Sequence, residues 1–322
     1  LYAKSTMSVS GAGYGDLAKA TETLDEAKEI LASIDISAIE HQDSEKKALL
    51  IRKAHMLKFG YGKASLELIL SKANESPDEN VKRSLLLKAV DVCKASAESG
   101  QNYYDTTGDW KGLKFKQNAK VELGNQLLAL GDAEGSRIAR EEAIDLIESY
   151  ASNDPSPDTD RAIAITIFNL AEISSPQEAM RLLARAIPLQ RTVVKAQPDY
   201  SRRLRDLAYM LELRGRVQIE TGDNIEAGLV DIQESASLFT RRAINNPQAK
   251  GAQSDFETFM IMFSQLLVDT GHSNMVSKIC IASINQLDHL ASGESVAGRD
   301  DWIEILSRLR NQIVETEITT AP

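Results

Sequence analysis

The residues best suited to metal binding or nucleophilic catalysis are few in this sequence and widely spaced. None of the four histidines has an i, i+4 partner or a neighbouring cysteine at ligand spacing. The two cysteines are far apart and form no C-x-x-C motif, which predicts two buried thiols rather than a disulfide or a metal-binding pair. We therefore expect no metal ion and no cofactor. The residues concerned are His41, His55, His272, His289, Cys93 and Cys280.

Three short segments have the composition of ligand-binding loops, but each departs from the required spacing. The glycines of residues 11–15 follow no strand, and the third is misplaced for a dinucleotide fingerprint, so a flexible leader is expected there. Residues 62–65 lack the upstream spacing of a P-loop. The carboxylates of Asp154, Asp158 and Asp160 lack the central glycine and final glutamate of a calcium loop, which predicts solvated turn residues. Because no G-x-S-x-G motif occurs either, the sequence predicts a protein that is not an enzyme.

Charge is distributed unevenly along the chain. The total of −10 argues against a protein whose main task is binding nucleic acid. The segment from Glu178 to Arg216 has nine basic and four acidic residues, a net charge of +5, whereas Asp16 to Glu45 has a net charge of −7. Both segments are interpreted either as solvated helix faces or as binding surfaces, the basic one for an acidic protein, an acidic peptide or a small anion. A third interpretation is contact between the acidic end and a neighbour's basic patch.

The elements that must position these residues are predicted to be helices. Hydrophobic residues make up 43% of the 322 residues, aromatic residues only 5%, and there are only eight prolines, which together favour an all-α protein with a sizeable core. No apolar stretch is long enough to span a membrane. Apolar spacing and caps predict about thirteen helices, with a turn at residues 60–62, a helix end near Gly100 and a kink or break at Pro188. The expected ranges are 16–33, 44–59, 63 onward, 76–100, 111–130, 134–150, 159–173, 176 onward, 201–221, 225–244, 254–270, 274–290 and 300–313.

The predicted helix caps lie at polar residues that precede these ranges. Asp16 is expected to cap the first helix, and Ser76 and Ser175 to begin capping boxes. Asp158 or Thr159 is expected to cap the helix that follows Pro157, and Ser254 the one that ends near Thr270.

A motif of small residues recurs in the second half of the sequence. Gly124 is followed seven residues later by Gly131-Asp132 and then by Pro155, and Gly215 is followed in the same way by Gly222-Asp223 and Pro247. With Ser174 and Gly271 as weaker markers, the turns recur after 43, 48 and 49 residues. Because glycine inside a helix costs about 1 kcal/mol relative to alanine, Gly124 and Gly215 are expected to allow close approach of a partner helix. Ala179 and Ala227, five residues after their markers, are expected to be small for the same reason.

This pattern of in-helix small residue, Gly-Asp turn and terminal proline resembles the tetratricopeptide repeat over about residues 110–290. The repeats are longer than the usual 34 residues and look like the long-repeat arrays appended to bacterial signalling proteins such as Ser/Thr kinases. The resemblance implies a right-handed superhelical solenoid of antiparallel helix pairs. It also implies that ligands lie along the first helix of each pair. The residues that this places at the binding face are Asn118, Glu122, Asn125, Arg161, Tyr209, Glu212 and Arg216.

The sequence thus predicts a non-enzymatic protein-binding or peptide-binding scaffold, the regulatory or sensor region of a larger bacterial-type signalling protein. The alternative is a sensor domain that binds a small anion at its arginine-rich repeats, where Arg181, Arg185, Arg202 and Arg205 join the binding set. The partners expected are a protein or peptide of acidic character and other domains of a parent protein, with no nucleic acid. The compartment is left open, with the cytoplasm favoured over an extracytoplasmic location. The expected divisions are 1–15, 16–100, 101–290 and 291–322.

Overall fold

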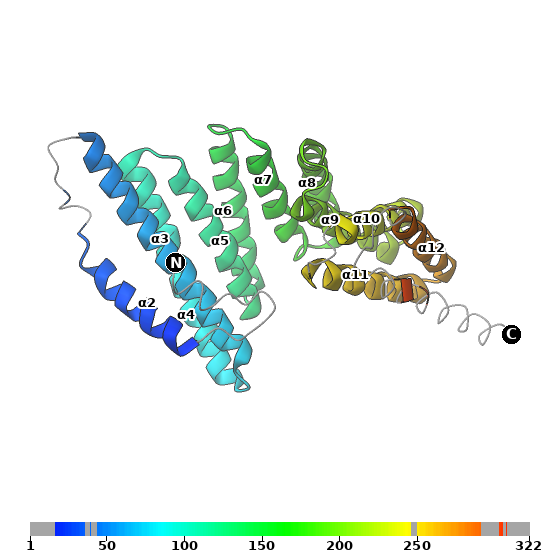
Figure 1. The fold of residues 1–322 in the computed structure, drawn as a ribbon, viewed down its shortest axis with the longest axis horizontal. Helices are drawn as coiled ribbons and strands as arrows, with labels where there is room; N and C mark the ends of the chain where they lie inside the picture. Colours follow the sequence, from blue (N-terminus) through cyan, green and yellow to red (C-terminus); the bar gives the residue numbers. More distant parts are fainter. Residues whose placement is uncertain are drawn as a thin grey trace. The chain divides into compact units, whose positions relative to one another are not determined.

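The structure, a computed structural model, describes residues 17–35, 39, 44–245, 250–290, 303, 304 and 307. The elements in these ranges are eleven α-helices, which confirms the all-α class that was predicted (Figure 1). None of the helices described is long and apolar enough to cross a membrane. The leader at 1–15, the cap at Asp16, Pro247 and most of the helix predicted at 300–313 lie outside these residues. The helices are α2 (Leu17–Ala32), α3 (Ser44–Glu75), α4 (Glu79–Thr107), α5 (Lys111–Ala129), α6 (Ala133–Ala151), α7 (Pro157–Ala171), α8 (Pro176–Ala196), α9 (Ser201–Thr221), α10 (Ile225–Asn245), α11 (Lys250–Asp269) and α12 (Ser273–Leu290).

Two predicted helix ends are wrong because the glycines that suggested them serve helix packing. The turn predicted at residues 60–62 lies inside α3, where a Cβ atom at Gly62 would collide with the side chain of Ser96 in α4. Gly100 does not end α4, because a Cβ atom there would lie 2.8 Å from the carbonyl oxygen of Gly112 in α5. Both glycines therefore allow close helix contacts. The helix α4 ends instead at Gly108, whose φ of 65° is the left-handed conformation of a C-cap.

Pro188 does not split its helix. α8 runs without interruption from Pro176 to Ala196 with Pro188 inside it. Seven residues of α8 are buried, so tertiary packing compensates for the hydrogen bond that proline removes.

Several predicted caps are also displaced. Asp78, not Ser76, caps α4 by accepting hydrogen bonds from the N–H groups of Asn80 and Val81. Ser156, rather than Asp158 or Thr159, caps α7 by accepting the N–H of Thr159 at 3.2 Å. Ser175 precedes α8 as predicted but makes no capping hydrogen bond through its side chain, and Ser254 lies inside α11. At α4 and α7 a neighbouring polar residue forms the cap, and α11 begins before the residue that was predicted to cap it.

Glycine turns recur as the motif predicted, with one exception. Gly131, Gly222 and Gly271 have φ values of 84°, 75° and 78°. In the first and third copies the residue after the glycine donates its N–H to the carbonyl of Leu127 or Leu267, five residues back, as in a Schellman motif. Ser174 lies in the turn before α8, but no residue other than glycine has a positive φ in the part of the chain described. Ser174 therefore lies at the expected turn but does not adopt the left-handed conformation of the glycines.

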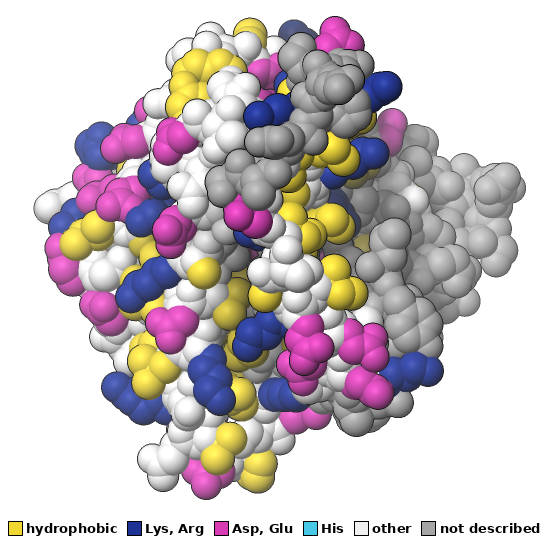
Figure 2. Space-filling view, turned by 90° about the vertical axis from the view of Figure 1, so that its left-hand side faces the viewer, with side chains coloured by type: hydrophobic (Ala, Val, Ile, Leu, Met, Phe, Trp, Pro, Cys, Tyr) yellow, Lys and Arg dark blue, Asp and Glu magenta, His cyan; other side chains and the backbone are white. Residues whose placement is uncertain are grey.

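The chain divides into two compact units, residues 1–159 and 160–322. In unit 1, α2, α3, α4, α5 and α6 pack in chain order (Figure 1). Leu66, Val90, Cys93 and Leu123 form a buried cluster between α3, α4 and α5. Figure 2 shows the face of the molecule on the side of α2 and α3, where hydrophobic, basic and acidic side chains lie next to one another.

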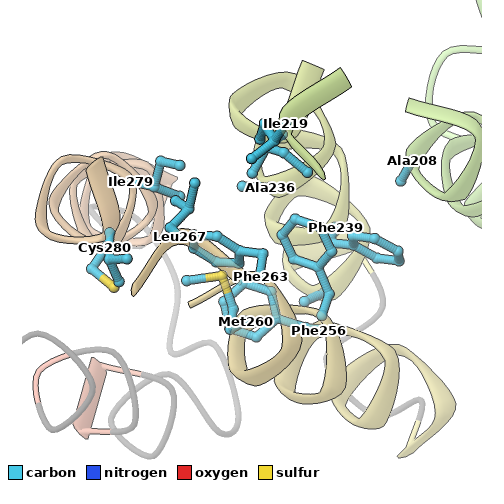
Figure 3. Packing of buried hydrophobic residues seen from close by; sticks show 14 residues of the cluster. Ala208, Ile219, Ala236, Phe239, Phe256, Met260, Phe263, Leu267, Ile279 and Cys280 are labelled. Atoms are coloured by element: carbon cyan, nitrogen blue, oxygen red, sulfur yellow. The ribbon is translucent and has the colours of Figure 1, made fainter. Parts of the chain in front are cut away.

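In unit 2, α8 packs on α9, α9 on α10, and α10 on both α11 and α12. Its core is rich in aromatic residues, and Figure 3 shows Phe239, Phe256 and Phe263 packed together with Met260 and Leu267. Cys280 is buried in this core and Cys93 in that of unit 1, as predicted. The four-part division predicted from the sequence stays a prediction.

The in-helix glycines of the motif mark close contacts, as predicted. A Cβ atom at Gly215 would lie 2.8 Å from the carbonyl oxygen of Gly228 in α10, and one at Gly124 would lie 2.9 Å from Cγ of Arg140 in α6. Ala179 is buried as predicted. In the second copy, however, the small contact residue of α10 is Gly228 and not Ala227, which is only half-buried.

Candidate binding surface

Three residues predicted at the binding face lie on α5 in unit 1. Asn118 is exposed, whereas Glu122 and Asn125 are half-buried, and Nδ2 of Asn125 donates to Oε2 of Glu122 at 3.4 Å. The buried Arg140 of α6 donates from Nη2 to Oδ1 of Asn125 at 3.0 Å. Gly124 makes this arrangement possible, because its missing side chain leaves room for Arg140 to lie against α5.

Two of the predicted residues of unit 2, Arg161 and Arg205, meet at a carboxylate that was not among the predicted residues. Asp206 of α9 is buried, and its Oδ2 lies 2.6 Å from Nη2 of Arg161 in α7. Arg205 approaches the other oxygen of Asp206 at 3.4 Å. One carboxylate therefore connects two helices and holds two of the predicted arginines.

One helical turn further along α9, Tyr209 continues these contacts toward α11. Its hydroxyl donates to Oδ1 of Asp255 at 3.2 Å, and Asp255 also pairs with Arg242 of α10, whose Nε donates to Ser201 at 3.1 Å. Burial, followed by the nearby charge of Asp255 and the hydrogen bond to it, raises the pKa of Tyr209 to about 12. At neutral pH the phenol is therefore a hydrogen-bond donor.

We call this set the polar row. It connects α7, α9, α10 and α11 through two aspartates, and it holds donors in fixed positions at the surface of unit 2. Partial exposure remains at Arg161, whose side chain is 26% exposed, and at Arg205, at 39%. Such guanidinium groups suit recognition of carboxylates. The members of the polar row are Arg161, Arg205, Asp206, Tyr209, Arg242 and Asp255.

Glu212 and Arg216, two further predicted residues, pair with each other on α9. Their Oε1 and Nε atoms lie 3.0 Å apart. Burial raises the pKa of Glu212, the charge of Arg216 and the hydrogen bond from it oppose that rise, and the charges of Glu172 and Glu220 add to it. This pair lies on α9 beyond the polar row.

The structure does not bring the remaining predicted arginines to the polar row. Arg181 pairs with Glu178 on its own helix, 2.6 Å away, and Arg185 and Arg202 are exposed on α8 and α9. Of the nine basic residues in this stretch, two pair with carboxylates from outside it, Glu234 and Asp231, and at least five in all form ion pairs. These five are Arg181, Arg191, Arg205, Arg214 and Arg216.

Sequence reasoning missed Asp206, Asp255 and Arg242 because the partners of each pair are too distant in sequence for any spacing rule. The only available signal was the position of Asp206 beside Arg205, inside a segment counted only for its net charge. The same applies to Asp231 of α10, which binds Arg214 through two contacts of 2.6 and 2.7 Å.

No protein family and no curated protein matches this chain. Among solved structures, one that it resembles is a circular tandem repeat protein with novel repeat topology and enhanced subunit contact surfaces, at 16% sequence identity and a TM-score of 0.31, covering 94% of this chain and 79% of the other. Another comes from the computational design of self-assembling cyclic protein homooligomers, at 12% identity and a TM-score of 0.20, covering 95% and 97%.

The class of protein is therefore defined by the chain's own helices. It is an all-α array in which helices pack largely in chain order and glycine turns recur.

Proposed function

We propose that this chain is a non-enzymatic scaffold that binds a protein or peptide of acidic character, and that it serves as the regulatory or sensor region of a larger signalling protein. The observation that carries the proposal is the polar row, in which donors from separate helices are held by two carboxylates, the buried Asp206 and the half-buried Asp255. Side chains fixed before binding lose less conformational entropy when a partner arrives. The row is therefore suited to recognition.

The extent of the row favours a peptide over a small molecule. Packed helices lie about 8–10 Å apart, so contacts that run from α7 across α9 to α11 extend over roughly 20 Å. An extended segment with two or more carboxylates could meet Arg161 and Arg205 together. The alternative, a small anion bound among Arg181 to Arg216, has less support because those guanidinium groups are distributed over α8 and α9, and Arg181 pairs with Glu178 on its own helix.

A displayed peptide library selected on the full chain tests the proposal. The selected peptides should be acidic, and Arg205→Glu should weaken their binding by about tenfold or more, as measured by fluorescence anisotropy. Arg137→Glu is the matched control, because Arg137 is also an exposed arginine with helical ion pairs but lies on α6.

Thermal-shift measurements with phosphate, citrate and a nucleotide separate the two candidates. A ligand that binds the folded state stabilises it by RT ln(1 + [L]/Kd). If one of these anions stabilises the chain and Arg205→Glu abolishes the effect while no peptide is selected, the scaffold proposal is wrong and the small-anion sensor is correct.

A further inference from the structure

The first half of α3 exposes an apolar face that no described element covers. Leu49, Leu50, Met56 and Leu57 are 43–58% exposed, although each lies within a regular helix. Helical geometry places them on one side, because Leu49 and Met56, like Leu50 and Leu57, are seven residues apart. The opposite side of the same turns carries the buried His55. The exposed residues therefore form a second face of the helix.

The same part of α3 also carries many basic residues. Residues 44–63 contain six basic residues and one acidic residue. Lys46 and Lys53 are both exposed and lie seven residues apart. On the helix surface they lie between the row formed by Leu49 and Met56 and the row formed by Leu50 and Leu57. We call this surface the basic ladder: Lys46, Leu49, Leu50, Lys53, Met56 and Leu57.

The neighbouring helix α2 carries the complementary charge pattern. Glu22, Asp25, Glu26 and Glu29 are all exposed and follow i, i+3, i+4, i+7 spacing, which places them on one stripe. Ile30, 63% exposed, lies beside it. We call these residues the acidic stripe. The carboxylates from Glu22 to Glu29 and the lysines from Lys46 to Lys53 each span seven residues, about 10 Å of helix.

The acidic stripe does not lie on the basic ladder of its own chain. α2 packs on the second half of α3 through Ala20 and Leu24, which contact Leu68, and Lys72 donates to Thr21 at 2.8 Å. Because Ala20 and Leu24 occupy the side of α2 opposite to Glu22 and Glu26, the stripe faces outward. A second molecule can bring its acidic stripe onto this basic ladder.

We propose that two copies of this chain associate through these surfaces, with α2 of each copy lying on the basic ladder of the other. The contact is isologous, since both copies use both surfaces, and it closes as a two-fold dimer. The carboxylates of the acidic stripe meet the lysines of the basic ladder, and Ile30 meets its apolar residues. An anionic membrane fits less well, because the four carboxylates of α2 lie beside the ladder and repel acidic headgroups.

Charge reversal on each surface tests the association. Lys46→Glu with Lys53→Glu makes both surfaces acidic, and Glu22→Lys with Glu26→Lys makes both basic, so each double variant should be monomeric. An equimolar mixture of the two restores opposite charges at both contacts and should form a heterodimer. Sedimentation velocity of the full chain measures each state at concentrations up to about 100 µM, where even weak dimers are populated. Lys88→Glu with Lys94→Glu, on exposed positions of α4, is the control and should behave as the unchanged chain does.

The expected result is a dimer for the unchanged chain, at least tenfold weaker self-association for each double variant, and recovery in the mixture. Circular dichroism confirms that the variants keep their helices. The proposal is overturned if the unchanged chain is monomeric throughout, or if it dimerises equally well with either pair reversed. It is also overturned if the monomer binds phosphatidylserine vesicles through Lys46 and Lys53.

Discussion

A side chain at the contact between Gly215 of α9 and Gly228 of α10 should be costly, and Gly215→Ala tests this. Each glycine faces the other's carbonyl oxygen, and a Cβ atom added to either would lie 2.8 Å from that oxygen. A second atom, Cγ1 of Ile232, would lie only 3.0 Å from a Cβ atom at position 215. Because the nearest obstacle is backbone, no rotamer change relieves it, and the two helices must move apart.

The expected magnitude follows from two opposing effects. Alanine inside a helix is favoured over glycine by about 1 kcal/mol. Overpacking of a close contact costs about 1–3 kcal/mol. The substitution should therefore be roughly neutral to 2 kcal/mol destabilising. Gly60→Ala is the matched control: Gly60 lies inside α3 with nothing within 4 Å of its added Cβ atom, so only the gain of about 1 kcal/mol applies.

The free energy of unfolding of both variants is measured by urea denaturation, with hydrogen exchange of α9 and α10 to localise the effect. Gly215→Ala should be about 1–3 kcal/mol less stable than Gly60→Ala. Faster exchange should appear in α9 and α10 of Gly215→Ala only. Equal stabilisation by both substitutions would refute the assignment of Gly215 as a helix-contact residue.

Four further predictions concern titratable groups. Asp255→Asn should lower the pKa of Tyr209 from about 12, but not to its ordinary value, because burial remains; phenolate absorbance against pH measures this. Burial raises the pKa of Glu212, so its contribution to stability is present below about pH 4.3 and is lost as the pH rises through the folded value; Glu212→Gln should remove that dependence in urea denaturation. Burial lowers the pKa of His55, so stability should fall as the pH drops below about 6.5, and His55→Phe should abolish this loss in thermal unfolding. Burial raises the pKa of the Cys93 thiol to about 12, so a thiol reagent should modify it only as fast as the protein opens, roughly 100-fold or more slowly than in denaturant.

The sequence was sufficient for the fold class and for most helix positions, because apolar periodicity and left-handed glycine turns are local signals. Prediction of helix ends failed at some glycines, because glycine can either end a helix or lie inside a helix that a neighbouring helix approaches closely. Gly131 and Gly222 end helices with positive φ, whereas Gly62 and Gly100 lie inside helices and permit contact with a neighbour. The two uses differ only in whether another helix passes nearby, which no local pattern reveals.

The candidate site was predictable only in part for a related reason. Tetratricopeptide-like placement named Arg161 and Tyr209, which lie on α7 and α9, but not the carboxylates that they contact. Asp206 and Asp255 reach their partners across helix boundaries, 45 residues apart for Arg161 and Asp206. A count of net charge does not distinguish a solvated aspartate from one that an arginine of another helix holds in a fixed position.

These cross-helix pairs also give unit 2 a means to hold its helices in register. Apolar faces of similar helices can slide by one turn at little cost, because one leucine replaces another. A slide of α9 against α7 or α10 would separate the buried Asp206 from Arg161 and Asp231 from Arg214. Breaking a buried ion pair costs about 3–5 kcal/mol, comparable to much of a domain's stability. The contacts that present donors on the surface of unit 2 are thus the same contacts that fix its helices, so a partner bound at the polar row would sense the packing of the array beneath it.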